Sequence, residues 1–236
     1  MSSPAPQRQA LSPLSDFSGS LAQKAYASLK DAILTLKFRP GEALRKPEIC
    51  EELGVSRAPL GEALARLAAE DLVELVPQAG SYVARFSMSK IQEAAFLREA
   101  LELAAVEQVA LTITEEQLVL LRRNLRFQSV LAEDEDGAGF YAMDAQMHDL
   151  ILSFTGFPRL SVLAQTTWVH VNRARQLVLP LEGRIKKTLA EHQDILDALE
   201  ARDPIAARAK TQLHLRQLIP YLEPLETTHP ELFAPR

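Results

Sequence analysis

Apolar residues in the first third of the chain recur with two different spacings. Ala25, Leu29 and Ile33 follow a helical period, and Gly54 suits the end of one helix just before another begins. Further along, two short β-type runs flank a Pro-Gln-Ala-Gly turn. The pattern predicts three helices and then two strands, at about 21–37, 47–53, 56–70, 72–76 and 81–84.

From about residue 87 onward only the helical period remains. Breaks such as Gly156-Phe157-Pro158 separate one apolar-periodic run from the next, and Thr112 with Glu115 fits a capping box. We therefore expect a mostly α fold, in which an N-terminal winged helix-turn-helix precedes a C-terminal all-α helical bundle. The helices expected in that bundle are about 89–110, 115–133, 140–154, 158–178, 184–201 and 204–222.

Composition divides the chain into a tail and two domains. Residues 1–19 are rich in Ser, Pro and Gln, which is typical of a disordered tail. Residues 20–86 are expected to form the winged helix-turn-helix domain, and residues 87–236 the all-helical domain. The single cysteine, the lack of a long apolar run and an N-terminus unlike a secretion signal predict a cytoplasmic protein that does not span a membrane.

The order of elements in residues 20–86 is that of a DNA-binding module. Helix-turn-helix proteins contact base edges with the first turn of their recognition helix. Here that turn is Ser56, Arg57, Ala58 and Pro59. Arg57 has the side chain that is able to bond a guanine through two nitrogens.

Three further positions complete the predicted DNA contacts. Arg45 and Lys46 could reach phosphates, and Gly80 at the hairpin tip would let the wing approach the minor groove closely. Bulk charge does not indicate such a partner, because the net charge is −5 and residues 20–86 carry nine Lys/Arg and nine Asp/Glu. The prediction of double-stranded DNA binding therefore depends on local geometry.

Three histidines and an aspartate in the C-terminal half have a spacing typical of a metal site. Asp144 and His148 are one helical turn apart, so they project from one face. His192 and His214 each lie eleven residues from the break at 203–204, so they would face each other if the chain folds back there. Three nitrogen ligands and one oxygen ligand suit Zn²⁺ or Ni²⁺.

Segments in both halves of the sequence resemble a known protein family. The segment LRKPEICEELGVSRAPLGEALARLAAEDLV, residues 44–73, resembles the signature of GntR-family transcription regulators. In the second half, FLREALE at 96–102, the Asp144/His148 pair, AEHQDILDAL at 190–199 and Asp203-Pro204 followed by His214 match, in order, the effector domain of that family's FadR-like subgroup. The resemblance covers about residues 20–222.

This resemblance implies a homodimeric regulator whose affinity for a near-palindromic operator is controlled by a small carboxylate at the metal. Arg98 occupies the position used for carboxylate binding in related regulators, although a surface ion pair with Glu102 is an alternative role. Asn172 and Arg175 could add polar contacts to this effector, or could belong to a solvated helix face.

The sequence departs from the family pattern at positions that grip DNA. Gly61 stands where members usually carry an arginine, Asp71 stands where a glycine is usual, and no basic residue precedes Gly80. Fewer positive charges imply a weaker attraction to phosphates.

Two other functions remain open. The metal could itself be the signal or a structural clip with no organic effector, or it could activate water in a hydrolase with Glu191 or Asp194 as the base. The chain has no nucleophile motif and no glycine-rich phosphate loop, so we expect that it is not an enzyme.

Overall fold

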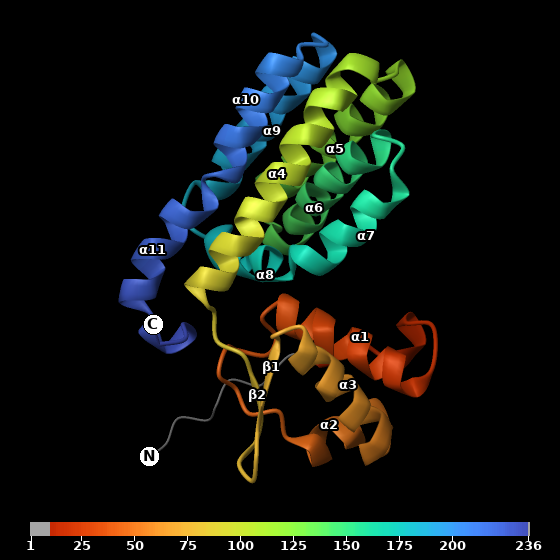
Figure 1. The fold of residues 1–236 in the computed structure, drawn as a ribbon, viewed down its shortest axis with the longest axis vertical. Coiled ribbons are helices and arrows are strands. Elements are labelled where there is room, and N and C mark those ends of the chain that lie inside the picture. The colour runs from red at the N-terminus through yellow and green to blue at the C-terminus, as the bar shows by residue number, and fades with distance from the viewer. Residues whose placement is uncertain (1–9, 236) are drawn as a thin grey trace. The chain divides into compact units, whose positions relative to one another are not determined.

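The computed structural model describes residues 10–235, which form two compact units (Figure 1). The N-terminal unit contains residues 10–88 together with 226–235, and the C-terminal unit contains residues 89–225. The N-terminal unit is built from η1 (Leu14–Asp16), α1 (Leu21–Leu34), α2 (Lys46–Leu53), α3 (Arg57–Ala69), β1 (Val73–Val76), β2 (Gly80–Val83) and η2 (Pro230–Leu232).

Local sequence signals explain the elements of the N-terminal unit. Ser20 and Gln23 form a capping box that starts α1, and Gly54 ends α2 with a left-handed φ of 65°. The strands pair antiparallel in the register Val73↔Val83 to Val76↔Gly80. The mostly α fold with an N-terminal winged helix-turn-helix is therefore confirmed.

The predicted tail is wrong for the part of it that the structure describes. Residues 1–9 lie outside the described range, but Leu11 is only 6% exposed and its backbone N–H donates to Glu52 Oε1 at 2.6 Å. Ser28 Oγ donates to the carbonyl oxygen of Ser12 at 2.7 Å. Residues 10–19 are ordered because these polar contacts and one apolar side chain fix them against α1 and α2.

The C-terminal unit ends earlier in the chain than predicted, at Leu225 rather than at residue 236. Residues 226–235 belong to the N-terminal unit, because Phe86 exchanges two backbone hydrogen bonds with this segment, to Leu232 at 2.9 Å and from Ala234 at 2.8 Å. The rings of Phe86 and Phe233 are 5.6 Å apart. No local pattern could reveal this pairing, because it joins positions almost 150 residues apart.

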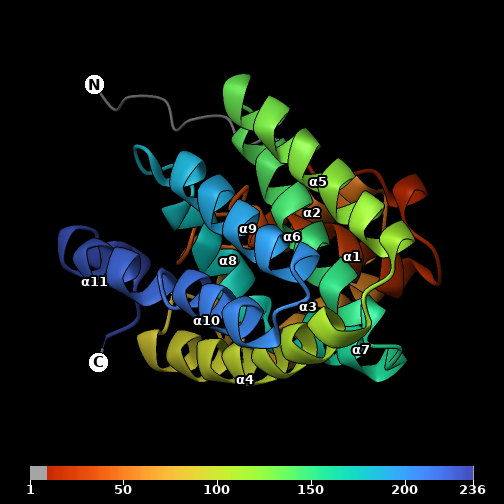
Figure 2. The same cartoon turned by 90° about the horizontal axis from the view of Figure 1, so that it is seen from above.

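The C-terminal unit is a bundle of helices, in which α9 lies between α5 and α10 (Figure 2). Its core is formed by apolar side chains from α4, α5, α6, α9 and α10, with Val106, Leu121, Ile151 and Leu199 among the most buried. The helices are α4 (Met88–Thr112), α5 (Glu115–Glu133), α6 (Gly137–Phe154), α7 (Pro158–Thr167), α8 (Val169–Val178), α9 (Arg184–Glu200), α10 (Pro204–Leu215) and α11 (Leu218–Thr228).

Three predicted helix limits are corrected by local chemistry. The helix expected over 158–178 breaks at Trp168 into α7 and α8, and the one expected over 204–222 breaks into α10 and α11. Pro220 explains the second break, because proline has no N–H for a carbonyl four residues earlier. The capping box of α5 is Thr114 with Gln117 rather than Thr112 with Glu115.

Candidate metal and effector site

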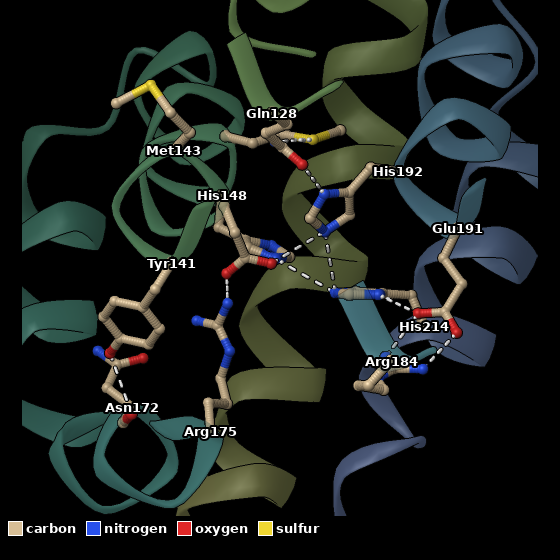
Figure 3. A network of polar contacts seen from close by, with 12 residues as sticks. Gln128, Tyr141, Met143, His148, Asn172, Arg175, Arg184, Glu191, His192 and His214 are labelled. Atoms are coloured by element: carbon tan, nitrogen blue, oxygen red, sulfur yellow. Dashed lines mark hydrogen bonds and ion pairs between the residues drawn. The ribbon is translucent and has the colours of Figure 1, made fainter. Parts of the chain in front are cut away.

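The predicted ligands converge inside the C-terminal unit. Asp144 and His148 lie on α6, His192 on α9 and His214 on α10, and ligand atoms of all four lie within 4.8 Å of one another. His214 Nε2 is 3.3 Å from His148 Nε2 and 3.4 Å from His192 Nε2, and His192 Nε2 is 3.3 Å from Asp144 Oδ1. The three imidazole rings point toward one another in Figure 3.

The other ring nitrogen of each histidine contacts a side-chain oxygen. Nδ1 of His148 is 2.6 Å from Glu102 Oε2, and Nδ1 of His214 is 2.8 Å from Glu191 Oε2. Nδ1 of His192 is 2.8 Å from Gln128 Oε1 (Figure 3). Because a carboxylate or amide oxygen only accepts, Nδ1 donates in all three contacts, and Nε2 is the nitrogen of each ring that faces the other two rings.

This donor set fits a tetrahedral metal ion. Two ligands of a zinc ion with zinc–nitrogen bonds of about 2.0–2.1 Å lie roughly 3.4 Å apart, which agrees with the nitrogen spacings found here. Apart from an ion pair with Arg175, neither oxygen of the fully buried Asp144 accepts a hydrogen bond within residues 10–235.

Burial also keeps two of these imidazoles neutral. It lowers the pKa of His192 and of His214 well below 6.5, and the neighbouring imidazoles and arginines lower the pKa further. A metal-binding imidazole must be unprotonated, so no proton has to be removed from these two rings at neutral pH before a metal binds.

Three buried arginines surround the four ligands. Arg98 Nε donates to Glu102 Oε1 at 2.5 Å and its guanidinium lies 5.1 Å from the Trp168 ring. Burial raises the pKa of Glu102, but Arg98 and His148 outweigh it and hold that carboxyl pKa well below its usual range. The ion pair of Arg98 and Glu102 therefore exists, but it is buried rather than at the surface, with side chains 6% and 3% exposed.

Arg175 and Arg184 are also buried beside the four predicted ligands. Arg175 forms an ion pair with Asp144, and burial lowers its pKa to about 10, so it remains charged at neutral pH. Arg184 donates to both oxygens of Glu191 at 2.8 Å. A solvated helix face is therefore wrong for Arg175, whose side chain is 9% exposed.

Two small cavities adjoin the four predicted ligands. One, of about 30 Å³, is lined by six polar residues, Arg98, Asp144, Arg175, Arg184, Thr188 and His214, and by the apolar residues Val178, Leu179, Leu215 and Leu218. The other, of about 70 Å³, is lined by Arg98, His148, Asp149, Trp168, Asn172 and Arg175. All three residues predicted to contact an effector thus line cavities, and Asn172 is half-buried, so a solvated face is also wrong for it.

Sequence reasoning missed the residues that orient the ligands. Gln128 gave no signal, because a glutamine on an amphipathic helix is ordinary, and only the fold brings α5 to His192. Glu191 was expected at most as a general base. Its carboxylate is instead held by Arg184 and His214, while Asp194 forms a surface ion pair with Lys210 at 2.7 Å.

The predicted DNA contacts lie on the N-terminal unit. Ser56, Arg57 and Ala58 are exposed at the start of α3, and Pro59 is half-buried behind them. Ser56 is the N-cap residue as expected, but its hydroxyl makes no capping hydrogen bond. The remaining predicted contacts are also exposed, at Arg45, Lys46 and Gly80.

Family models match both units. The model described as "Bacterial regulatory proteins, gntR family" matches residues 21–83, and the model described as "FCD domain" matches residues 93–217. The chain belongs to the GntR family. It is a DNA-binding transcription regulator of that family, with an FCD effector domain as its C-terminal unit.

Relatives of this GntR regulator carry related names. A Streptomyces ambofaciens protein named as an uncharacterized HTH-type transcriptional regulator in an unstable DNA locus is 33% identical, over 89% of this chain and 88% of its own length. The Escherichia coli HTH-type transcriptional repressor RspR is 32% identical, over 83% and 86%. Both of these relatives are named as proteins that regulate transcription.

Solved structures show the same fold. Escherichia coli McbR/YncC superposes with a TM-score of 0.74 at 23% identity, over 88% of this chain and 99% of that one. A GntR protein from Rhodococcus sp. RHA1 gives a TM-score of 0.73 at 24% identity, over 92% and 100%. Within residues 10–235, no helix combines the length and the apolar character needed to cross a bilayer.

The structure explains two departures from the GntR pattern. A Cβ atom at Gly61 would meet nothing within 4 Å, so the backbone there leaves room for the arginine that the family usually carries. Asp71 has a left-handed φ of 57°, which is the conformation that favours the usual glycine. Gly61 therefore differs from the family pattern in charge, and Asp71 differs in backbone strain.

Proposed function

We propose that this regulator binds a divalent transition metal and a small carboxylate effector, which together control its affinity for an operator. The convergence of three imidazole Nε2 atoms and one carboxylate carries the proposal, because this donor set suits a divalent transition metal. The ligands would be Asp144, His148, His192 and His214, with Zn²⁺ or Ni²⁺ as the metal.

An ion held here would supply positive charge and a coordination position for an effector oxygen. The residues of the chain would orient that effector from both sides. Arg98 and Arg175 line both cavities and Asn172 lines one of them, so their donors are available to a carboxylate on either side of the ligands.

DNA recognition would use the surface of the N-terminal unit. Arg57 would contact base edges, with Ser56, Ala58 and Pro59 beside it in the first turn of α3. Arg45, Lys46 and Gly80 would contact the sugar-phosphate backbone and the minor groove. Two copies of the chain would bind a near-palindromic operator as a homodimer, and the effector would favour one placement of the two N-terminal units.

Metal analysis tests the site directly. After removal of loosely bound ions, the full chain should retain about one zinc or nickel ion per copy, because the candidate ligand atoms of four side chains lie within 4.8 Å of one another. Asp144→Asn should lose most of this metal, whereas His229→Ala should retain it, since His229 is exposed and distant in sequence from the ligands. Equal metal content in both variants would contradict the assignment.

Operator binding tests the effector. A duplex selected from randomised DNA would be titrated with zinc-loaded and chelator-treated protein, with and without a panel of small organic acids. Fluorescence anisotropy should show that at least one acid changes the operator Kd of the zinc-loaded protein. The scale expected of such coupling is about 5- to 150-fold.

A metal sensor or metal-stabilised regulator without an organic effector is the second candidate. The small volume of the cavity beside His214 favours it, because about 30 Å³ accommodates a water molecule or two but no organic acid without side-chain movement. This candidate predicts that zinc raises the melting temperature, while no acid in the panel changes operator binding.

A further inference from the structure

The wing strand β2 is bonded along both of its edges. β1 pairs with one edge, and residues 41–44 bind the other edge through three backbone hydrogen bonds of 2.8 Å. Arg45 and Lys46 follow this segment directly in the chain. The predicted DNA contacts that lie outside the first turn of α3, which are Arg45, Lys46 and Gly80, therefore share one backbone framework.

The chain that leaves β2 is fixed by a C-terminal segment, residues 230–234. Arg85 Nε donates to the backbone carbonyl of Glu231 at 3.1 Å. At the next position, Phe86 forms its two backbone hydrogen bonds with the same segment. Both links lie within three positions of Val83, where β2 ends, so they fix the direction in which the wing strand leaves the sheet.

Apolar packing closes the same pairing. Phe86 and Phe233 are only 3% and 4% exposed, and their rings contact each other. Without residues 230–234, Phe86 would lose a buried aromatic neighbour and the partners of its backbone N–H and carbonyl, and both losses are costly. A two-stranded hairpin is marginally stable by itself in water, so its orientation depends on such neighbours. The C-terminal segment thus supplies a support that β1 and β2 do not give each other.

The supporting residues come from the far end of the chain. α11 begins at Leu218 in the C-terminal unit, and the chain enters the N-terminal unit at Glu226. The two matched regions end at residues 83 and 217, so neither Phe86 nor its partners fall within them. The support is therefore a feature of the full chain rather than of the matched GntR region alone.

We propose that the C-terminal segment positions the wing for DNA, with Phe233 as the positioning residue. Phe233 raises operator affinity without touching DNA, because it fixes Phe86 and thereby the strand that carries Gly80. The inference rests on the wing contact of the proposed function and goes beyond it by adding residues outside the DNA-binding surface. It predicts that loss of this support lowers operator affinity only while the wing is able to contact DNA.

A double-mutant cycle on the full chain tests this dependence. Ala79→Glu puts a negative charge on the exposed wing tip, next to Gly80, and should repel the tip from the phosphates. Phe233→Ala should weaken binding to an operator duplex selected from randomised DNA by about tenfold, but by less than about twofold when Ala79→Glu is already present. Combined with Arg57→Ala on α3, its factor should instead multiply to within about twofold. Anisotropy titrations give all of these Kd values.

A second pair of variants addresses the backbone bond and leaves Phe233 in place. Ala234→Pro removes the N–H that donates to the Phe86 carbonyl at 2.8 Å, whereas Ala234→Ser keeps it. Proline should weaken operator binding by about threefold or more relative to serine. With proline, hydrogen exchange should be faster in peptides that cover residues 80–86 and unchanged in peptides from α3. A protein that is merely less stable would exchange faster in both.

The outcomes separate this inference from the function on which it rests. If Ala79→Glu leaves operator affinity unchanged, the wing contact is wrong and the inference fails with it. If Ala79→Glu weakens binding but neither Phe233→Ala nor Ala234→Pro does, the wing contact stands and the inference is wrong. Equal factors for Phe233→Ala with and without Ala79→Glu would also overturn it, because the substitution would then act on stability alone.

Discussion

The two units of this protein place their polar chemistry in opposite positions. Among the described residues, the N-terminal unit buries two serines, Ser28 and Ser81, but no charged side chain. The C-terminal unit buries arginines, histidines, an aspartate and a glutamate together. DNA is a large ligand that is bound from outside, whereas an ion or small acid is enclosed. The difference teaches that removing an exposed charge from the N-terminal unit should change DNA binding, whereas removing a buried charge from the C-terminal unit should change stability.

Of the substitutions that test this contrast, Glu102→Gln in the C-terminal unit should cause the largest change, a loss of stability. Glu102 is 3% exposed and holds both Arg98 and His148, so losing its charge leaves a buried cation poorly compensated. We expect the free energy of unfolding of metal-free protein to fall by about 3 kcal/mol. Glu107→Gln, on the same helix, removes an exposed pair with Arg208 and should cost less than about 1 kcal/mol. Urea unfolding of both variants measures the difference, and similar losses would contradict it.

Arg57→Ala should change binding but not stability. Arg57 is the first residue of α3 and its side chain is exposed. Removal of its predicted contact with a guanine should cost about 1–3 kcal/mol in the free energy of operator binding. The cost should be small on duplex of scrambled sequence. Arg45→Ala should weaken binding to both duplexes and reduce the salt dependence by about one unit of slope. Anisotropy titrations at several salt concentrations make the comparison, and an unchanged preference in Arg57→Ala would remove that residue from base recognition.

Gly61→Arg should tighten DNA binding by restoring a positive charge. The open space at this position accepts a side chain, and one more phosphate contact should steepen the slope of log K against log salt by about 0.9. Gly61→Ala is the control, since it should stabilise the helix by about 1 kcal/mol without altering the slope. If alanine and arginine tighten binding equally, helix stability rather than charge is responsible.

Asp71→Gly should give the smallest change. Its left-handed backbone is strained for aspartate, but glycine also loses more freedom on folding, so the net gain in stability should be about 0.5 kcal/mol. Asp71→Ala, which keeps the strain, should give no such gain. Thermal unfolding that shows alanine to be as good as glycine would exclude backbone strain as the cause.

Local signals allowed much of the fold to be predicted from the sequence. Gly54 marked the end of α2 because its backbone is left-handed, and Asp203 with Pro204 marked the start of α10, where the aspartate accepts hydrogen bonds from two backbone N–H groups. The equal distances of His192 and His214 from that break indicated the ligand pair, and these imidazoles do meet.

Features that depend on tertiary packing could not be predicted. Glu102 was paired with Arg98 by spacing alone, but its burial and its contact with His148 come from the packing of α4 on α6. Gln128 reaches His192 across 64 positions. The break at Trp168 was missed because the apolar period continues through it, and a period does not report where backbone hydrogen bonding stops.

The pairing of Phe86 with residues 232–234 has a consequence for synthesis. A ribosome adds about 5–20 residues per second, so residues 232–234 follow Phe86 by roughly 7–30 s. The helices and hairpin that bind DNA emerge long before that, while the segment that joins them to α4 still lacks its final contacts. During translation, the helices and hairpin of the N-terminal unit are thus made well before residues 226–235, the segment that completes this unit.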